Sequence, residues 1–110
     1  METRFLTVGD AGALDELFAR SHEAPVLVFK HSTSCPISAG AYRQMERVGG
    51  EVALIVVQRA RDASRLVEER TGVRHESPQA LLLRNGSVVW SASHWDVTAE
   101  AVAGALREHA

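Results

Sequence analysis

Cys35, the one cysteine among 110 residues, has the clearest chemical capacity in this sequence. Pro36 follows it and suits the first turn of a helix, because the N–H that proline lacks would be unpaired there in any case. A cysteine at or beside the helix N-cap can receive the N–H groups of Ile37 and Ser38, which favour thiolate over thiol. We therefore predict a lowered pKa for the Cys35 thiol and a nucleophile that attacks disulfides.

Ser38 stands three residues after Cys35, where a dithiol enzyme would carry its second cysteine. Its hydroxyl can donate a hydrogen bond to a thiolate but cannot form a disulfide with it. A lone cysteine also excludes an internal disulfide and any zinc or iron–sulfur site built from several cysteines of one chain. A mixed disulfide at Cys35 must then be resolved by a low-molecular-weight thiol or a partner protein. The alternative is that Cys35 only fills space at a strand-to-helix turn.

Other residues are candidates for binding the substrate. Lys30 and His31 could add positive charge near the thiol, and Lys30 could recognise a thiol ligand. Pro78 precedes a predicted strand, where a cis Ser77–Pro78 bond would make a tight, exposed turn and a trans proline would only start the strand. Beside Cys35, a cis bond would let the Ser77 backbone pair with an extended substrate. The predicted thiol-binding set is Lys30, His31, Ser34, Pro36, Ile37, Ser38, Ser77, Pro78 and Trp95.

Trp95, with His94, follows the last predicted strand. Its indole could form an apolar wall for a thiol ligand, or it could cover the end of the sheet. The five histidines of the chain show no metal-ligand spacing with carboxylates or a second cysteine. We therefore predict no metal site.

Short apolar runs predict the strands that must position these residues. The runs at 25–29 and 52–57 are continuously apolar and rich in β-branched residues, which is typical of strands buried on both faces of a sheet. Two later runs flank Asn85-Gly86, a strong signal for an antiparallel hairpin. The predicted strands are 5–8, 25–29, 52–57, 79–83 and 88–90.

Capping residues and helical spacing predict four helices. Asp10 and Thr98 are N-cap residues that precede apolar side chains at helical spacing. Gly72 and the pair Gly49-Gly50 are placed to end helices. The predicted helices follow Asp10, run from Pro36 to Val48, span 62–70, and follow Thr98.

The resulting order is β-α-β-α-β-α-β-β-α. Alternating strands and helices imply an α/β architecture with right-handed parallel crossovers, to which the last hairpin adds an antiparallel pair. This is the element order of the thioredoxin fold. Because the chain has 110 residues and shows no repeat or linker, we predict a single domain over 1–110.

Composition excludes several classes of function. Apolar residues make up 45% and charged residues 24%, as in ordinary globular proteins. The formal net charge of -2 argues against a nucleic-acid partner, which would require a basic excess. No apolar run is long enough to span a membrane, and the first residues do not resemble a signal peptide. We expect a cytoplasmic protein, and a monomer rather than a dimer.

Three segments, at 29–38 (FKHSTSCPIS), 75–79 (HESPQ) and 92–96 (ASHWD), resemble the YtxJ-like monothiol bacilliredoxins. The similarity extends over nearly the whole chain. It implies a thioredoxin-like fold, Cys35 as nucleophile, and Pro78 as the cis-proline of that fold, preceded by Ser77. It also implies a thiol–disulfide oxidoreductase that removes bacillithiol, a low-molecular-weight thiol carrying malate and glucosamine, from bacillithiolated proteins. Bacillithiol would be a co-substrate, with no bound cofactor.

Two alternatives to this function remain at the level of sequence. One is a thioredoxin-like binding module that recognises a partner without thiolate chemistry, in which Cys35 would be unreactive. The other is an iron–sulfur carrier like the monothiol glutaredoxins, in which two chains and two small thiols hold a cluster. Those proteins usually have glycine after the cysteine, whereas this chain has Pro36, which removes a backbone donor and stiffens the loop.

Overall fold

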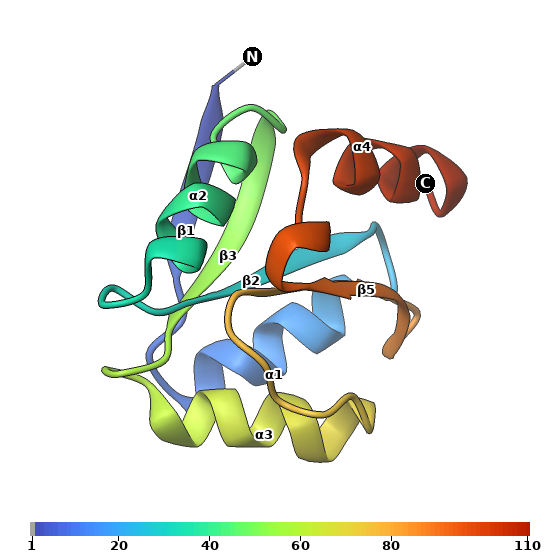
Figure 1. The fold of residues 1–110 in the computed structure, drawn as a ribbon. Helices are drawn as coiled ribbons and strands as arrows, with labels where there is room; N and C mark the ends of the chain where they lie inside the picture. The colour runs from blue at the N-terminus through green and yellow to red at the C-terminus, as the bar shows by residue number, and fades with distance from the viewer. Residues whose placement is uncertain (1) are drawn as a thin grey trace.

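The computed structural model describes residues 2–110, and its strands form one five-stranded sheet with helices on both faces (Figure 1). The strands are β1 (Thr3–Thr7), β2 (Val26–His31), β3 (Gly50–Val56), β4 (Gln79–Arg84) and β5 (Ser87–Ser93). The helices are α1 (Ala11–Arg20), α2 (Pro36–Met45), α3 (Arg61–Thr71) and α4 (Ala99–Glu108), with a short 3-10 helix, η1 (His94–Asp96), before α4. The predicted order of strands and helices is confirmed, and η1 is the addition.

The strand order β1-β3-β2-β4-β5 places β2 at the centre of the sheet. β1, β3 and β2 are parallel, whereas β4 is antiparallel to both β2 and β5. Lys30 near the end of β2 pairs with Gln79, the first residue of β4. The loop that leaves β2 toward Cys35 and the segment that enters β4 through Pro78 therefore meet at one edge of the sheet.

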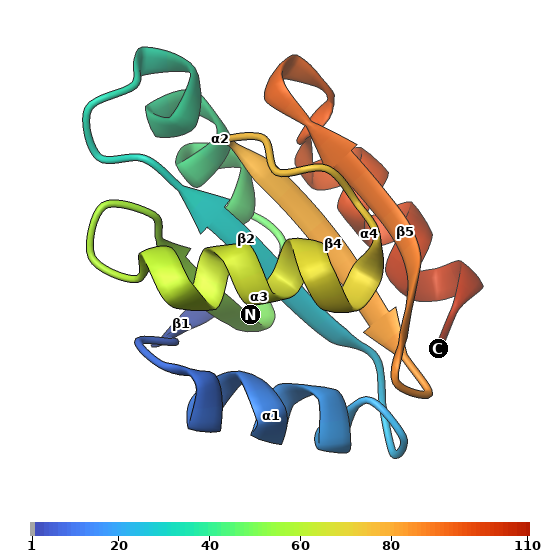
Figure 2. The same cartoon turned by 90° about the horizontal axis from the view of Figure 1, so that it is seen from below.

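Side chains of β2 alternate between two hydrophobic layers, as the period of a strand requires. Val26 and Val28 face the layer formed with α1 and α3. Leu27 and Phe29 face the layer formed with α2 and α4. Figure 2, which shows the molecule from below, places α1 and α3 together over one face of the sheet. This continuous burial explains why the sequence of β2 is almost wholly apolar.

Three of the predicted caps and the predicted hairpin turn are present. The Asp10 side chain accepts a hydrogen bond from the Ala13 N–H, and Thr98 caps α4 in the same way. Gly72 ends α3 in the left-handed conformation, with φ of 73°. Asn85 and Gly86 both have positive φ, as the predicted two-residue hairpin turn needs.

Helix α2 is shorter than predicted, because it ends at Met45 rather than Val48. Residues 46–48 form a turn in which the Val48 N–H donates to the Met45 carbonyl. Gly49 and Gly50 follow with φ of 80° and 81°, so two successive left-handed residues lead the chain into β3. Within residues 2–110, no helix is long and apolar enough to cross a membrane.

Candidate active site

Cys35 is the N-cap of α2, in extended conformation, and Pro36 begins the helix, as predicted. Its side chain is partly exposed to solvent. The uncharged sulfur completes no capping hydrogen bond, but the free N–H groups of the first helical turn lie next to it. The arrangement therefore favours the anionic form of the sulfur over the neutral one.

The surroundings of Cys35 hold the pKa of its thiol below the ordinary value. The backbone N–H of Ser38 is the largest cause, and the Ile37 N–H and the Ser38 hydroxyl act in the same direction, while desolvation opposes them. Ser38 is fully buried, and its hydroxyl accepts a hydrogen bond from the Ser32 N–H at 3.2 Å. The sequence prediction of a lowered pKa agrees with this geometry.

Gln58, which follows the end of β3, holds the loop before Cys35 in place. Its amide Nε2 donates to the hydroxyls of Ser32 at 2.8 Å and Ser34 at 3.2 Å. Its Oε1 accepts from the Thr33 N–H at 3.3 Å. Sequence reasoning missed Gln58, although the carboxyl ends of the parallel strands β2 and β3 must meet at this edge.

Lys30 and His31 do not flank the thiol as expected, because neighbouring residues of a strand point to opposite faces. Lys30 is fully buried on the α3 side, so a thiol ligand does not reach its ammonium group directly. His31 lies on the α2 side, with its ring centroid 5.1 Å from that of Tyr42. Burial lowers the pKa of His31 and favours its neutral form. The lowered pKa of Cys35 thus comes from the α2 terminus rather than from these two residues.

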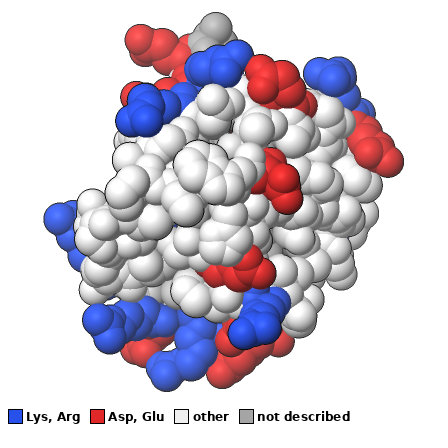
Figure 3. Space-filling model, in the orientation of Figure 1, with Lys and Arg blue, Asp and Glu red and all other residues white. Residues whose placement is uncertain are grey.

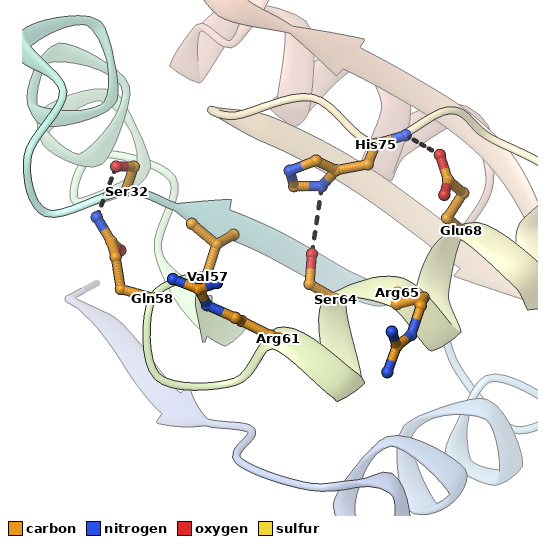
Figure 4. Close-up of a pocket in the computed structure, with 8 residues that line it drawn as sticks. All are labelled: Ser32, Val57, Gln58, Arg61, Ser64, Arg65, Glu68 and His75. Atoms are coloured by element: carbon orange, nitrogen blue, oxygen red, sulfur yellow. Dashed lines mark hydrogen bonds between the residues drawn. The ribbon is translucent and has the colours of Figure 1, made fainter.

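Lys30 belongs to a polar cluster with His75, which sequence reasoning also missed. Its Nζ lies 3.0 Å from Nδ1 of His75. The same Nδ1 lies 3.2 Å from the Ser64 hydroxyl, a contact that Figure 4 shows. Burial lowers the pKa of Lys30 to about 8. Burial and the neighbouring Lys30 charge lower the pKa of His75, so this ring is neutral near neutral pH.

The Ser77–Pro78 peptide bond is cis, and it lies beside the start of α2. The Ser77 hydroxyl is 3.5 Å from the Ser38 hydroxyl. The Pro78 carbonyl accepts a hydrogen bond from the His94 N–H at 2.9 Å, and the His94 ring pairs with Glu76 at 2.5 Å. These contacts join the cis-proline segment to η1 and so bring η1 toward Cys35.

Comparison with known proteins identifies the family and the fold of this chain. The family model described as monothiol bacilliredoxin BrxC matches residues 7–102. A solved structure described as having a thioredoxin fold, and assigned provisionally as an oxidoreductase, is 33% identical with a TM-score of 0.84, over 92% of each chain.

The chain belongs to the monothiol bacilliredoxin family.

Two thioredoxins show the fold alone. That of Fasciola hepatica is 14% identical with a TM-score of 0.75, over 94% of this chain and 98% of that one. That of Trypanosoma brucei brucei is 11% identical with a TM-score of 0.76, over 96% of this chain and 89% of that one. The predicted thioredoxin-like α/β fold and family are thus confirmed.

In this bacilliredoxin, most of the predicted site residues gather around the start of α2. Pro36, Ile37 and Ser38 form its first turn, and Ser34 precedes it. The Ser77 hydroxyl contacts this turn at the hydroxyl of Ser38. Of the predicted set, Lys30 alone is fully buried on the opposite side of the sheet from α2.

Trp95 is the most exposed large apolar residue of the described chain, with 74% of its surface accessible. Together with Ile37 it lines a groove of about 290 Å³ between α2 and η1. The indole therefore lies beside the helix that carries the thiol. The face that carries α2 and η1 is mostly uncharged, with some acidic side chains within it and most charged side chains towards its upper and lower margins (Figure 3).

Proposed function

We propose that this bacilliredoxin removes bacillithiol from protein mixed disulfides. The position of Cys35 at the N-cap of α2, with Ser38 where a second thiol would stand, supports this proposal most directly. The first feature lowers the pKa of the Cys35 thiol and so raises its thiolate fraction, and the second prevents the enzyme from resolving its own mixed disulfide. A chain with these two properties forms no internal disulfide and needs a second molecule, a small thiol or a partner protein, to resolve its mixed disulfide.

The first step is a thiol–disulfide exchange. The Cys35 thiolate attacks the bacillithiol sulfur of the substrate, the protein–bacillithiol S–S bond breaks, and the protein sulfur leaves as a thiolate that takes a proton from water. Cys35 then carries bacillithiol in a new mixed disulfide. The amides of Ile37 and Ser38 stabilise the Cys35 thiolate before attack and again when it is released.

The second step uses a second bacillithiol. Its thiolate attacks the bacillithiol sulfur on Cys35, which frees the Cys35 thiolate and forms bacillithiol disulfide. The net reaction converts a bacillithiolated protein and bacillithiol into a protein thiol and bacillithiol disulfide, so thiols and disulfides balance.

A non-catalytic binding module is the second candidate, and the exposed Trp95 groove favours it. Such a module would use the uncharged face around α2 and η1 without consuming the thiol. The polar environment that stabilises the thiolate favours the catalytic proposal, because a purely structural cysteine would gain nothing from a lowered pKa.

The test is the release of bacillithiol from a bacillithiolated protein, followed by intact-mass spectrometry of that protein in the presence of bacillithiol. The wild-type enzyme should remove the modification much faster than bacillithiol alone. Cys35→Ser should lose this acceleration, whereas Ser91→Ala, a change on the exposed part of β5, should retain it. Equal rates for the wild type and Cys35→Ser would reject catalysis and favour the binding module.

A further inference from the structure

A second hollow opens on the α3 side of the catalytic loop, and the proposed exchange reaction makes no use of it. Its volume is about 460 Å³, and Figure 4 shows the side chains around it. It lies between the loop that precedes Cys35 and the first turns of α3. The residues that define it are Ser32, Gln58, Arg61, Ser64, Arg65 and His75.

His75 presents a hydrogen-bond donor to this hollow. A lysine ammonium group is only a donor, so Nδ1 of His75 must accept the hydrogen bond from Lys30 at 3.0 Å. The neutral ring then carries its proton on Nε2. Figure 4 shows this second ring nitrogen turned into the hollow, away from Ser64. Buried Lys30 thus fixes the tautomer of a ring that faces solvent.

The charged side chains that line the hollow are Arg61, Arg65 and Glu68, which leave one positive charge in excess. Three further charged groups neighbour these residues: Lys30 contacts His75, Asp62 pairs with Arg65, and the charge of Glu76 acts on His75. All three carboxylates are engaged, since Asp62 accepts from Arg65 at 2.6 Å, Glu68 accepts from the backbone N–H of His75 at 2.6 Å, and Glu76 pairs with the His94 ring.

Arg61 makes no ion pair within residues 2–110, although it lines the hollow at the first residue of α3. Its guanidinium is therefore available to a carboxylate, with which it can form two parallel hydrogen bonds. The N–H groups of the first turn of α3 also favour a negatively charged ligand.

Gln58 connects this hollow to the reacting sulfur. Its amide lines the hollow and also holds the hydroxyls of Ser32 and Ser34, and Ser34 directly precedes Cys35. A ligand that extended from Cys35 across this loop would meet His75 and Arg61 on the far side.

We propose that the hollow binds the carboxylate-bearing part of the low-molecular-weight thiol whose sulfur reacts at Cys35. This inference rests on the proposed function. The malate group of bacillithiol has the required chemistry, because its carboxylates can accept hydrogen bonds from the Arg61 guanidinium and from Nε2–H of His75. Small thiols without carboxylates would lack this contact.

Exchange kinetics provide the first test. The rate constant of Cys35 with bacillithiol disulfide, divided by its rate constant with the uncharged bis(2-hydroxyethyl) disulfide, gives a selectivity ratio. Arg61→Gln should lower this ratio about tenfold, as expected for loss of one charge-assisted contact of about 1.4 kcal/mol. Arg107→Gln, the same change of charge on α4, should leave the ratio unchanged. Equal ratios for Arg61→Gln and Arg107→Gln would overturn the proposal.

Binding of malate itself provides the second test, and it does not depend on exchange. Lys30 is the only lysine of the chain, so a protein labelled with ¹³C-lysine and ¹⁵N-histidine gives one lysine side-chain signal. In Cys35→Ser, malate should shift the His75 ring nitrogens and the Lys30 signal saturably, and Arg61→Gln should weaken this binding. Absence of saturable shifts would reject the anion site.

The two tests separate the inference from the proposed function. If the wild type reacts with neither disulfide but malate binds, the exchange function fails and the anion site stands. If the wild type reacts with both disulfides but malate does not bind, the function stands and the anion site is rejected.

Discussion

At the scale of single residues, the site depends on hydrogen-bond donors that point toward one sulfur. Ser38 provides two of them, its backbone N–H and its hydroxyl, and the first of these is the largest cause of the lowered Cys35 pKa. The backbone contribution is independent of the side chain at position 38, whereas the hydroxyl contribution can be removed by mutation.

Ser38→Ala should therefore raise the pKa of Cys35 and slow its reaction severalfold at pH values below that pKa. The thiolate loses one donor but keeps both backbone donors, so the effect is partial. Ultraviolet absorbance of the thiolate as a function of pH measures the pKa, and Ser91→Ala is the control. An unchanged pKa in Ser38→Ala would contradict this role of the hydroxyl.

Lys30→Met should stabilise the protein near neutral pH by about 1 to 3 kcal/mol, because it removes a charge whose burial is costly. Nδ1 of His75 would still have the Ser64 hydroxyl as a partner. The folded pKa of Lys30 of about 8 lies below the ordinary 10.5. Between these values the unfolded chain binds more protons, so wild-type stability rises with pH across this window.

The measurement is urea unfolding of the wild type and Lys30→Met at about pH 7 and about pH 10. The advantage of Lys30→Met should shrink as pH rises from about 8 to 10.5. A difference in stability that stays constant over this range would show that the Lys30 pKa is not depressed.

The positions of four side chains could not be predicted from the sequence. Lys30 and His31 looked like one basic pair beside Cys35, because the strand was predicted to end at residue 29. β2 continues to His31, and strand alternation then sends the two side chains to opposite faces. His75 and Gln58 were missed because their contacts join residues 45 and 26 positions apart, and local patterns do not report such contacts.

At the scale of elements, local signals placed most caps and the hairpin turn, but the pair Gly49-Gly50 does not end α2, which stops at Met45. Asp10, Thr98, Gly72 and Asn85-Gly86 all have the predicted roles. The 3-10 helix η1 was not predicted, since its three residues are too short for any periodic pattern. Its position depends on His94, whose backbone N–H donates a hydrogen bond to the Pro78 carbonyl.

A pair of glycine substitutions tests the capping argument. Gly72→Ala should destabilise the protein by about 1 kcal/mol, because alanine is strained at φ of 73° although the new methyl group would touch nothing. Gly104→Ala, within α4, where a methyl group would make only an ordinary contact with the Arg107 side chain at 3.7 Å, should stabilise it by about 0.5 to 1 kcal/mol. Thermal or urea unfolding measures both, and effects of the same sign would contradict the assignment of these conformations.

At the scale of the whole molecule, the chain presents different chemistry on the two sides of Cys35. One side carries the mostly uncharged surface with Trp95 and Ile37, and the other carries the hollow with Arg61 and His75. Apolar exposed surface suits contact with another protein, whereas the positively charged hollow suits a small anion. This division fits an enzyme whose substrate is a protein joined to a small thiol.

Trp95→Ser should slow exchange with a bacillithiolated protein severalfold while changing the rate with bacillithiol disulfide less, because only the protein substrate would cover the indole. Val89→Ser removes an exposed apolar side chain from β5 and serves as the control. Competition between the two substrates, followed by mass spectrometry, gives both rates. Equal slowing of both substrates by Trp95→Ser would contradict a role of this groove in protein binding.

Whether Cys35 is a nucleophile is tested most directly by the intact mass of the reduced protein after brief mixing with bacillithiol disulfide near neutral pH. We expect rapid addition of one bacillithiol to Cys35, which excess thiol then releases and which Cys35→Ser does not form. A wild-type protein that remains unmodified while free small thiols exchange under the same conditions would show that Cys35 is not a nucleophile.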